Sequence, residues 1–358
     1  MQKKLIALAV AALASGAAFA QSNVTVYGTV DMGIAHRSSN MAKGVSSQNA
    51  INSGQAGSSL IGFKGVEDLG NGNKVLFVLE NGFYTDTGAD RGTYFNEQAF
   101  LGMTGSWGTA IAGRLVAPRF GFLKAMDPFA AGTVGRFGNV YEDGAEPGTA
   151  VTNVSRVNNA IAYVSPNFSG FNVTAAYATN ALGVENLEND GDARTYTLLP
   201  RYTNGPLDVG LVWQRVSIKN ASVSLNQWAL GGAYDFGAVK LSAAYDNFKQ
   251  NMPSGVYDPR MKSWLIGLSA PFGKNAVQFS YNQSKAKSAS GAPWGKSKQW
   301  ALGYTYDMSK RTNFYAAYAH VTNSKKNGVF LRNSSVSDIN NAGQGYRSGF
   351  QFGMKHNF

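Results

Sequence analysis

Cysteine is absent from the 358 residues, which excludes a disulfide framework and a thiolate metal site. Proline is scarce, with 10 residues, and only three histidines are present. After residue 20 no run of about eighteen apolar residues occurs, which excludes a membrane protein built from helices. No Pro/Ser-rich linker and no shift in composition divides the chain, so separate soluble domains are not indicated.

The chain is basic, with a net charge of +11 at pH 7 that falls to +9 once Lys3 and Lys4 are removed with the leader described next. The basic residues are scattered singly among aromatic residues and glycines. A nucleic-acid-binding patch is therefore not expected. The positive balance instead suggests small anionic partners.

The first twenty residues have the form of a cleaved secretory signal. Two lysines are followed by an apolar run over residues 5–13, and an A-x-A cleavage site ends at Ala20, directly before Gln21. An N-terminal membrane anchor is the alternative, but the run is too short to span and no stop-transfer pattern follows. We predict a signal peptide at 1–20, cleaved between Ala20 and Gln21, and one β-barrel domain over 21–358.

Alternation of period two runs through the rest of the chain in segments of roughly ten residues, the length that a tilted membrane strand needs. Clear examples are residues 24–34, 277–282, 299–307 and 350–358, the last ending on an aromatic carboxyl terminus at Phe358. One face is large and apolar. The other is small and polar rather than charged, as expected of a water-filled lumen and not of a soluble sandwich.

The connections between these segments alternate strictly between short and long. Short ones, rich in Gly, Asn and Pro, lie at about 69–73, 105–108, 166–170, 204–206, 236–238, 271–275 and 309–312. Long ones lie at about 37–58, 84–93, 116–155, 181–193, 219–225, 249–260, 285–296 and 322–344. Fifteen connections of this kind predict a sixteen-stranded antiparallel transmembrane β-barrel with short periplasmic turns and long extracellular loops.

Several local motifs closely resemble the Gram-negative general porins of the Neisseria/Burkholderia type. They occupy residues 24–31, 62–70, 112–114, 163–171, 234–237 and 309–312, together with the terminal Phe358. The resemblance covers the whole of 21–358. It implies a sixteen-stranded barrel, a third loop folded into the lumen, assembly as a homotrimer, and passive conduction of small hydrophilic solutes. It also implies that Phe358 is read by the barrel-assembly machinery, and that outer-membrane lipid and lipopolysaccharide surround the barrel.

The third long connection, 116–155, is too long for a plain surface loop, and connections of this size usually carry function. Its apolar side chains argue against the alternative of a disordered extracellular loop. Charge in a narrow passage of low dielectric sets pore selectivity. The residues expected at such a constriction are Lys64, Arg114, Arg119, Arg136, Arg156, Asp127, Glu142 and Glu146. For any single arginine the alternative is a structural ion pair that holds the loop.

Catalysis is not expected, because no G-x-S-x-G or H-E-x-x-H motif is present, and no cofactor or metal is predicted. His36, His320 and His356 fall at loop or rim positions. Five tryptophans and many tyrosines near strand ends predict an interfacial girdle rather than a sugar-stacking slide in the lumen.

The sequence therefore favours a passive, water-filled channel with a weak anion preference. A substrate-specific channel for a carboxylate or phosphate solute remains open at this point. So does a barrel that only anchors an adhesin or an enzyme.

Overall fold

The computed structural model describes residues 23–38, 47–141, 155–183, 193–219, 222–251, 260–287, 293–323 and 347–358. The predicted signal at 1–20 and its cleavage site, Ala20 and Gln21, lie outside this part of the chain. Within it, no helix is long and apolar enough to cross a membrane.

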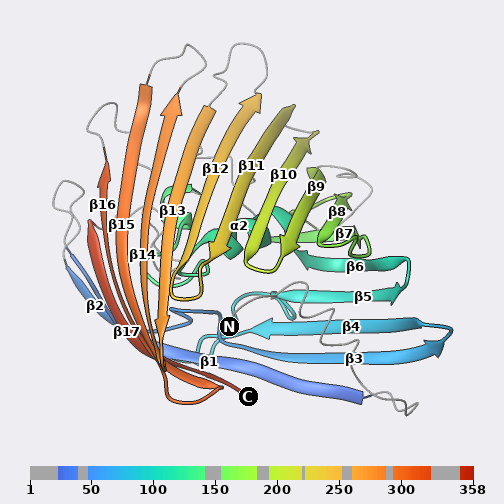
Figure 1. Cartoon of the computed structure of the whole chain (residues 1–358), viewed down its shortest axis with the longest axis horizontal. Coiled ribbons are helices and arrows are strands. Elements are labelled where there is room, and N and C mark those ends of the chain that lie inside the picture. The colour runs from blue at the N-terminus through green and yellow to red at the C-terminus, as the bar shows by residue number, and fades with distance from the viewer. Residues whose placement is uncertain are drawn as a thin grey trace.

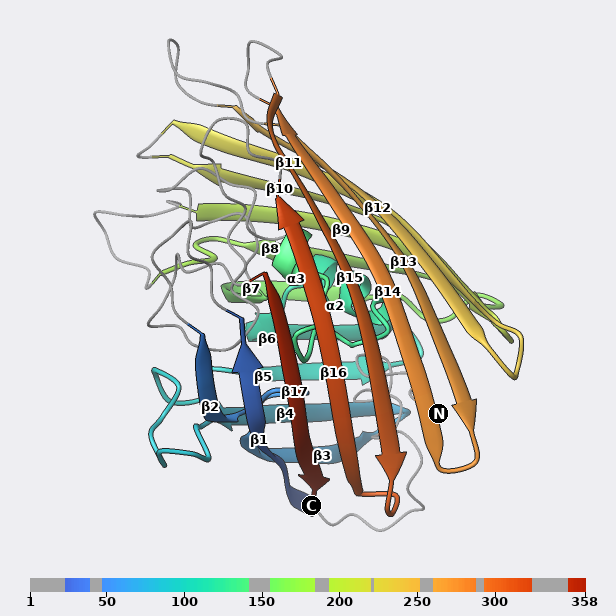
Figure 2. The same ribbon diagram turned by 90° about the vertical axis from the view of Figure 1, so that its left-hand side faces the viewer.

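Seventeen strand segments form one antiparallel sheet that closes on itself, with two short helices inside the ring (Figures 1 and 2). In chain order the strands are β1 (Asn23–Arg37), β2 (Gln48–Ser53), β3 (Leu60–Gly70), β4 (Asn73–Gly82), β5 (Gln98–Gly105), β6 (Gly108–Val116), β7 (Arg156–Val164), β8 (Phe171–Ala178), β9 (Ala193–Asn204), β10 (Leu207–Ile218), β11 (Val223–Asp235), β12 (Lys240–Asn251), β13 (Arg260–Phe272), β14 (Asn275–Lys287), β15 (Pro293–Asp307), β16 (Thr312–Asn323) and β17 (Ser348–Asn357). The helices are α2 (Pro118–Met126) and α3 (Gly138–Tyr141).

The seventeen segments occupy sixteen positions around the barrel, because β2 and β3 share one position. One half of β1 pairs with β3, from Asn23↔Val66 to Thr29↔Leu60. The other half pairs with β2, from Met32↔Ser53 to Arg37↔Gln48. The predicted number of strands is therefore confirmed.

The prediction of a plain loop over 37–58 is wrong in its second part. Residues 48–53 return as β2 because β1 runs past the end of β3 and would otherwise leave an unpaired backbone edge. Residues 54–59 then turn into the lumen, where the backbone N–H groups of Ala56 and Gly57 each donate to the Asp31 carboxylate at 2.7 Å.

The barrel closes between β1 and β17, which lie side by side in Figure 2. Phe358 completes this seam: its N–H donates to the Gly28 carbonyl at 3.1 Å, and the Gly28 N–H donates to the Phe358 carbonyl at 3.2 Å. The aromatic carboxyl terminus is thus part of the closure of the barrel.

The hairpin turns follow local chemistry. In the β3–β4 turn Asn71 and Gly72 both have positive φ values of 52° and 76°, which Asn-Gly tolerates well. All seven predicted short connections fall between paired strands at one end of the barrel, and the strand ends that lead into the long connections lie at the other end. We assign the short-turn end to the periplasmic side, as in outer-membrane barrels.

The apolar parity of each strand faces outward and the small, polar parity faces inward. Val26, Leu230 and Leu302 are at least half exposed on the outside, whereas Gln227, Ala229 and Gln299 are buried inside. The outward face is the surface that meets lipid. Fully buried apolar side chains lie inside the barrel, where the third loop packs against the wall.

Candidate functional site

The third loop enters the barrel after β6 and narrows its lumen, as predicted. α2 begins with Pro118 in its first turn, a position that needs no backbone donor. Its Phe122, Leu123 and Met126 side chains are almost completely buried against β9 to β13. This packing disfavours the alternative of a disordered extracellular loop for residues 118–141.

The third loop packs against glycines on the inner wall of the barrel. A Cβ atom at any of them would meet a side chain of the third loop at 3.0 Å or less. These glycines, one on each of five strands, are Gly210, Gly231, Gly267, Gly303 and Gly349. They form a shallow track that a bulkier side chain would fill, so the wall itself fixes the path of the loop.

Polar anchors hold the loop on this track. The Arg119 guanidinium forms a buried ion pair with Asp246 of β12 at 2.7 Å. The Ser242 hydroxyl donates to the Met126 carbonyl at 2.7 Å, and the Asn139 amide donates to Gln299 of β15 at 2.8 Å. Arg119, expected at the constriction, therefore faces the barrel wall. There it forms the structural ion pair that was the alternative for a single arginine, and it holds the loop.

Asp127 ends α2 with its carboxylate turned towards the loop backbone. It accepts N–H groups of Phe129, Ala131 and Phe137 at 3.0 to 3.1 Å. Burial raises the pKa of Asp127 to about 6, against the opposing effect of these three donors. Asp127 shapes the turn of the loop. Arg136, in the same turn, is half-buried and lowers the pKa of that carboxyl by its charge.

Lys64 of β3 lies on the inner wall. Its ammonium group is 5.0 Å from the centre of the Tyr27 ring, and the Tyr27 hydroxyl donates to Glu80 at 2.7 Å. Gln98 donates to the other oxygen of Glu80 at 2.7 Å. Two neutral donors thus hold the Glu80 carboxylate. Lys64 places its positive charge in the lumen beside it.

A second group stands at the extracellular end of this wall around Glu97. Arg156 is ion-paired with Glu97, and Arg91 lies 2.9 Å from its other oxygen. Burial raises the pKa of Glu97, but the two guanidinium groups outweigh that effect and hold it below its ordinary value. Two positive charges therefore share one carboxylate.

Arg114 is placed at a β-bulge of β6. Its Nε donates to the Asn96 carbonyl at 2.7 Å, and its terminal nitrogen donates to Asn158. These contacts tie β6 to β7 and to the segment before β5. Arg114 thus lies within the electrostatic reach of Arg156 and Glu97.

Lys124 faces this wall from α2, on the side of the helix away from Phe122 and Met126. The same side carries Phe120, whose ring centre is 6.0 Å from the Arg156 guanidinium. Burial lowers the pKa of Lys124, and the positive charges of Arg156 and Lys355 lower it further. Lys124 therefore completes a cluster of positive charge across the lumen.

Sequence reasoning missed the contributions of Lys124, Lys355, Arg91, Glu80 and Glu97. Lys355 shares its strand parity with Gln351, which points inward and accepts the Val134 N–H at 2.7 Å. The parity rule that selected Lys64 would also have selected Lys355 and Glu80. For Lys124 the signal was helical spacing. It lies four residues after Phe120, on the side of α2 opposite Phe122 and Met126.

The remaining expected residues lie elsewhere. Glu142 and Glu146 are outside the described residues. His36, His320 and His356 follow the outward parity, and in the described part of the chain no group of three His, Asp or Glu side chains could hold a metal ion.

The tryptophans face outward, as a girdle requires. Trp213 and Trp228 are opposite each other, and ring pairs join Trp228 to Tyr245, Trp264 to Tyr281 and Trp300 to Tyr318. This row, the extracellular aromatic row, crosses neighbouring strands from β10 to β16. On the lumen parity of the described strands, the hydroxyl groups of Tyr27 and Tyr315 donate to Glu80 and Asp31, which holds these two rings against the wall.

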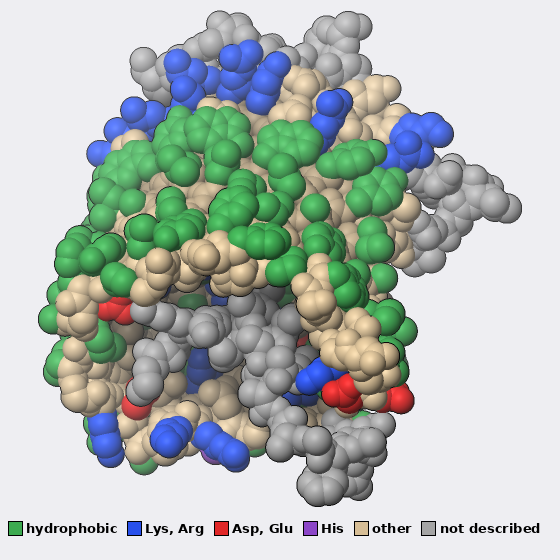
Figure 3. All heavy atoms as spheres, turned by 45° about the vertical axis from the view of Figure 1, so that its right-hand side comes forward, with side chains coloured by type: hydrophobic (Ala, Val, Ile, Leu, Met, Phe, Trp, Pro, Cys, Tyr) green, Lys and Arg blue, Asp and Glu red, His purple; other side chains and the backbone are tan. Residues whose placement is uncertain are grey.

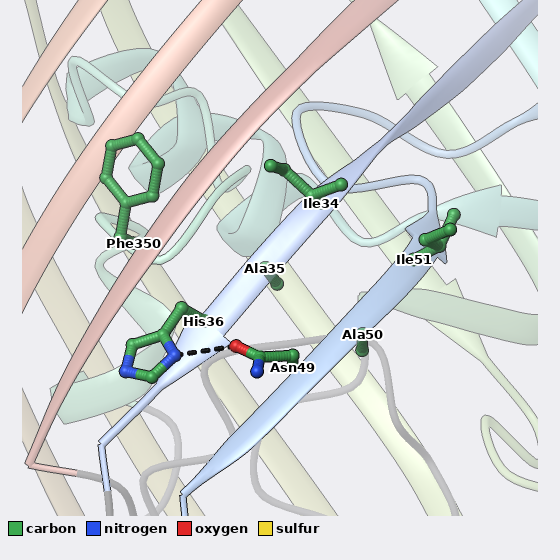
Figure 4. A pocket seen from close by; sticks show the side chains of 7 residues that line it. All are labelled: Ile34, Ala35, His36, Asn49, Ala50, Ile51 and Phe350. Carbon is green, nitrogen blue, oxygen red and sulfur yellow. Dashed lines mark hydrogen bonds between the residues drawn. The ribbon is translucent and has the colours of Figure 1, made fainter.

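A cavity of about 350 Å³ lies on the outer face, apart from the lumen. Ile34, Ile51 and Phe350 line it, together with His36, whose ring nitrogen is 2.7 Å from the Asn49 side-chain oxygen (Figure 4). It lies where β1, β2 and β17 meet. It is no part of the passage through the barrel.

Comparison with known proteins identifies the family to which this barrel belongs. The Gram-negative porin family model matches residues 7–326. The chain is a Gram-negative porin.

Relatives support this assignment. Outer membrane porin protein 32 of Delftia acidovorans is 35% identical over 254 residues, covering 70% of each chain. Major outer membrane protein P.IB of Neisseria gonorrhoeae is 34% identical over 263 residues, covering 68% of this chain and 70% of the relative.

Solved structures agree. The anion-selective porin from Comamonas acidovorans superposes with a TM-score of 0.78 at 31% identity, covering 94% of this chain and 100% of that one. The OmpT trimer form of Vibrio cholerae has a TM-score of 0.67 at 15% identity, with coverage of 94% and 99%, and shows likeness of fold. This porin is therefore an outer-membrane channel for passive diffusion of small hydrophilic solutes, and not an enzyme.

Proposed function

We propose that this porin prefers anions, and that the preference arises in the passage between α2 and the wall formed by β3 to β7. The observation that carries the proposal is an imbalance of charge. Among the described residues, six cations, Lys64, Arg91, Arg114, Lys124, Arg156 and Lys355, stand near three carboxylates, Asp31, Glu80 and Glu97. The protein walls of a narrow passage have a low dielectric, so screening is weak and each excess charge acts strongly on a passing ion.

The Comamonas acidovorans porin of known structure is anion-selective, which supports the proposal by analogy. A channel specific for one carboxylate or phosphate solute would use the same cluster as a binding site. The general channel and the specific channel differ in whether their conductance saturates. The general channel conducts in proportion to salt concentration, whereas a binding site of measurable affinity saturates and is blocked by its solute.

Planar-bilayer recording of a triple variant, Lys64→Gln, Lys124→Gln and Lys355→Gln, tests the proposal. Its zero-current potential in a KCl gradient should move towards the cation side relative to the wild type. The control removes Lys240, Lys274 and Lys310 in the same way, because these lie near the periplasmic turns. An equal shift in both variants, or none in the first, would contradict a local origin of selectivity.

Assembly as a homotrimer is part of the same proposal. The sector from β1 to β5 presents aliphatic side chains outward, such as Val26, Ile61 and Leu101, while the extracellular aromatic row lies on the other strands. The apolar hollow of Figure 4 belongs to this sector. A trimer would cover these surfaces. Light scattering of the protein in mild detergent tests this, and a species of monomer mass would contradict it.

A further inference from the structure

Residues 54–59 form a turn inside the barrel, between the end of β2 and the start of β3, which we call the lumen turn. Both of its ends are attached to the backbone of Asp31 on β1. The Gly54 N–H donates to the Asp31 carbonyl at 2.9 Å, and the Ser59 hydroxyl donates to the same carbonyl at 3.1 Å. The Asp31 N–H donates to the Ser59 hydroxyl oxygen at 3.0 Å. The turn is therefore fixed where it leaves the wall and where it returns to it.

The Asp31 side chain holds the middle of the lumen turn. It is fully buried, and one of its oxygens accepts the N–H groups of Ala56 and Gly57, whereas the other accepts the Tyr315 hydroxyl at 2.5 Å. Tyr315 lies on β16 and reaches β1 across Gly353 of the intervening β17, where a Cβ atom would clash with the tyrosine side chain. Three strands thus hold one carboxylate against the turn.

The tip of the third loop contacts the lumen turn. The Thr133 N–H donates to the Gln55 carbonyl, and Gly132 lies so close to the Ala56 backbone that a Cβ atom there would clash with it. Gln55 is itself held by a hydrogen bond from its side-chain amide to the Gly33 carbonyl of β1 at 2.8 Å. The position of the loop tip therefore depends on the lumen turn as well as on the glycines of the wall.

The lumen turn also contacts the charged groups of the passage. The Arg91 guanidinium donates to the Ser58 hydroxyl at 2.7 Å and to Glu97 at 2.9 Å, which joins the turn to the carboxylate that also binds Arg156. Figure 3 shows basic side chains inside the hollow of the barrel, within a wall whose outer surface is hydrophobic. The turn is thus connected directly to the basic cluster of the lumen.

Gly57 of the lumen turn lies beside Lys355 of β17. Of the described residues, Lys355 is the one that a Cβ atom at position 57 would contact, at 3.8 Å from Cδ and 4.0 Å from Nζ. These are ordinary contact distances, and Gly57 lacks the positive φ of Gly54, so a larger side chain fits there. Because the dielectric of a narrow passage is low, a charge attached at position 57 would act strongly on ions that pass Lys355.

We propose that the lumen turn is a second selectivity element of this channel, that Asp31 and Tyr315 are its positioning residues, and that position 57 sets the local charge beside Lys355. Glycine at position 57 adds neither charge nor bulk, so Lys355 keeps its full effect on passing anions. The turn and the third loop form one constriction, because each holds the other in place. This inference rests on the anion preference proposed above.

A cysteine at position 57 tests the proposal, because the chain contains no other cysteine. Gly57→Cys is folded and inserted into a planar bilayer first, and charge is added afterwards with a methanethiosulfonate reagent that carries either a sulfonate or a trimethylammonium group. We expect the sulfonate label to move the zero-current potential in a KCl gradient towards the cation side by about as much as Lys355→Gln does, since both changes lower the local charge by one. The trimethylammonium label should move it the opposite way.

Ser106→Cys is the matched control, because Ser106 is exposed in the turn between β5 and β6 at the periplasmic end. Either label there should leave the potential close to the wild-type value. The wild type should respond to neither reagent.

Tyr315→Phe tests the positioning role without changing any formal charge. It removes the hydroxyl donor of Asp31, so the lumen turn and the loop tip should loosen, and the single-channel current noise should rise. The shift caused by the sulfonate label at position 57 should shrink in this background, because the label no longer stands at a fixed distance from Lys355.

Tyr27→Phe is the matched control for Tyr315→Phe. The Tyr27 ring likewise crosses a glycine of the neighbouring strand, Gly62, but its hydroxyl donates to Glu80 and not to Asp31. The current noise and the response to the sulfonate label should therefore stay as in the protein with Tyr27.

Failure of position 57 to react, or labels of opposite charge that shift the potential equally, would overturn the proposal. A shift as large from Ser106 would overturn it as well, since net charge and not position would then govern selectivity. A quiet Tyr315→Phe channel with an unchanged label response would contradict the role of Asp31 and Tyr315. A wild type without chloride preference would refute the proposed function, whereas the response to the two labels would still decide whether the lumen turn lies on the passage.

Discussion

Lys124 brings positive charge into the lumen from the third loop, close enough to Arg156 and Lys355 for their charges to lower its pKa. It sits on the lumen side of α2, opposite the wall that carries Lys64 and Arg156, and no strand pattern could place it. Its charge therefore acts on ions from the loop side of the passage.

Replacing Lys124 with Gln should shift the zero-current potential towards the cation side while the conductance in 1 M salt stays nearly unchanged. The shift should be larger at about 0.01 M salt, where the Debye length is roughly 30 Å, than at 1 M, where it is about 3 Å. Planar-bilayer recordings at the two salt concentrations check this. A shift independent of salt would indicate a change in loop position instead.

Asp127 gives a pH prediction whose sign can be worked out. Its pKa is raised to about 6 in the folded protein, so the folded state binds a proton more tightly than the unfolded chain, where the value is about 4. Stability from this group is therefore greatest below about pH 4 and is lost as the pH rises through about 6. The difference is at most about 3 kcal/mol, from two pKa units at about 1.4 kcal/mol each.

Asp127→Asn, which mimics the protonated carboxyl in size, should remove that pH dependence. Melting temperatures in detergent between pH 4 and 8 should fall with rising pH in the wild type and change less in the variant. Parallel curves would mean that Asp127 titrates in its ordinary range.

At the scale of elements, the third loop depends on the track of wall glycines and on the buried ion pair between Arg119 and Asp246. Arg119→Met alone should destabilise the loop by about 3 to 5 kcal/mol, because it leaves the Asp246 charge buried without its partner. The expected signs are a noisier single-channel current and faster proteolysis of the loop. Adding Asp246→Leu should restore a quiet channel, since an apolar pair of similar volume removes the stranded charge. A double variant as noisy as Arg119→Met would show that the arginine acts in another way.

Much of the architecture could be predicted from the sequence, because strand parity and turn chemistry depend on residues that are close together in the chain. The alternation of residues 299–307 and the Asn71-Gly72 turn each fix their own geometry. The features that the sequence did not predict depend on contacts between residues far apart in the chain. The return of residues 48–53 as β2 depends on the free edge of β1, and the role of Arg119 depends on Asp246, 127 residues away in the chain.

On the scale of the whole molecule, closure of the barrel joins the two ends of the described chain. Deleting Phe358 removes both backbone hydrogen bonds to Gly28 and the ring that covers it. We expect the truncated protein to be exported but poorly inserted, because the seam and the proposed signal for the barrel-assembly machinery are both lost. Quantitative blotting of outer-membrane fractions checks this, with Phe358→Tyr as the control that should insert normally. Normal outer-membrane levels of the truncated chain would refute it.

We propose that a cluster of six cations and three carboxylates among the described residues, and not the overall charge, sets the selectivity of the channel. The most direct measurement is the zero-current potential of the wild-type porin in a tenfold KCl gradient, at several mean salt concentrations. We expect a potential of the sign given by chloride preference, and its magnitude should grow as the salt is diluted. A potential of the opposite sign, or one that does not change with dilution, would contradict it.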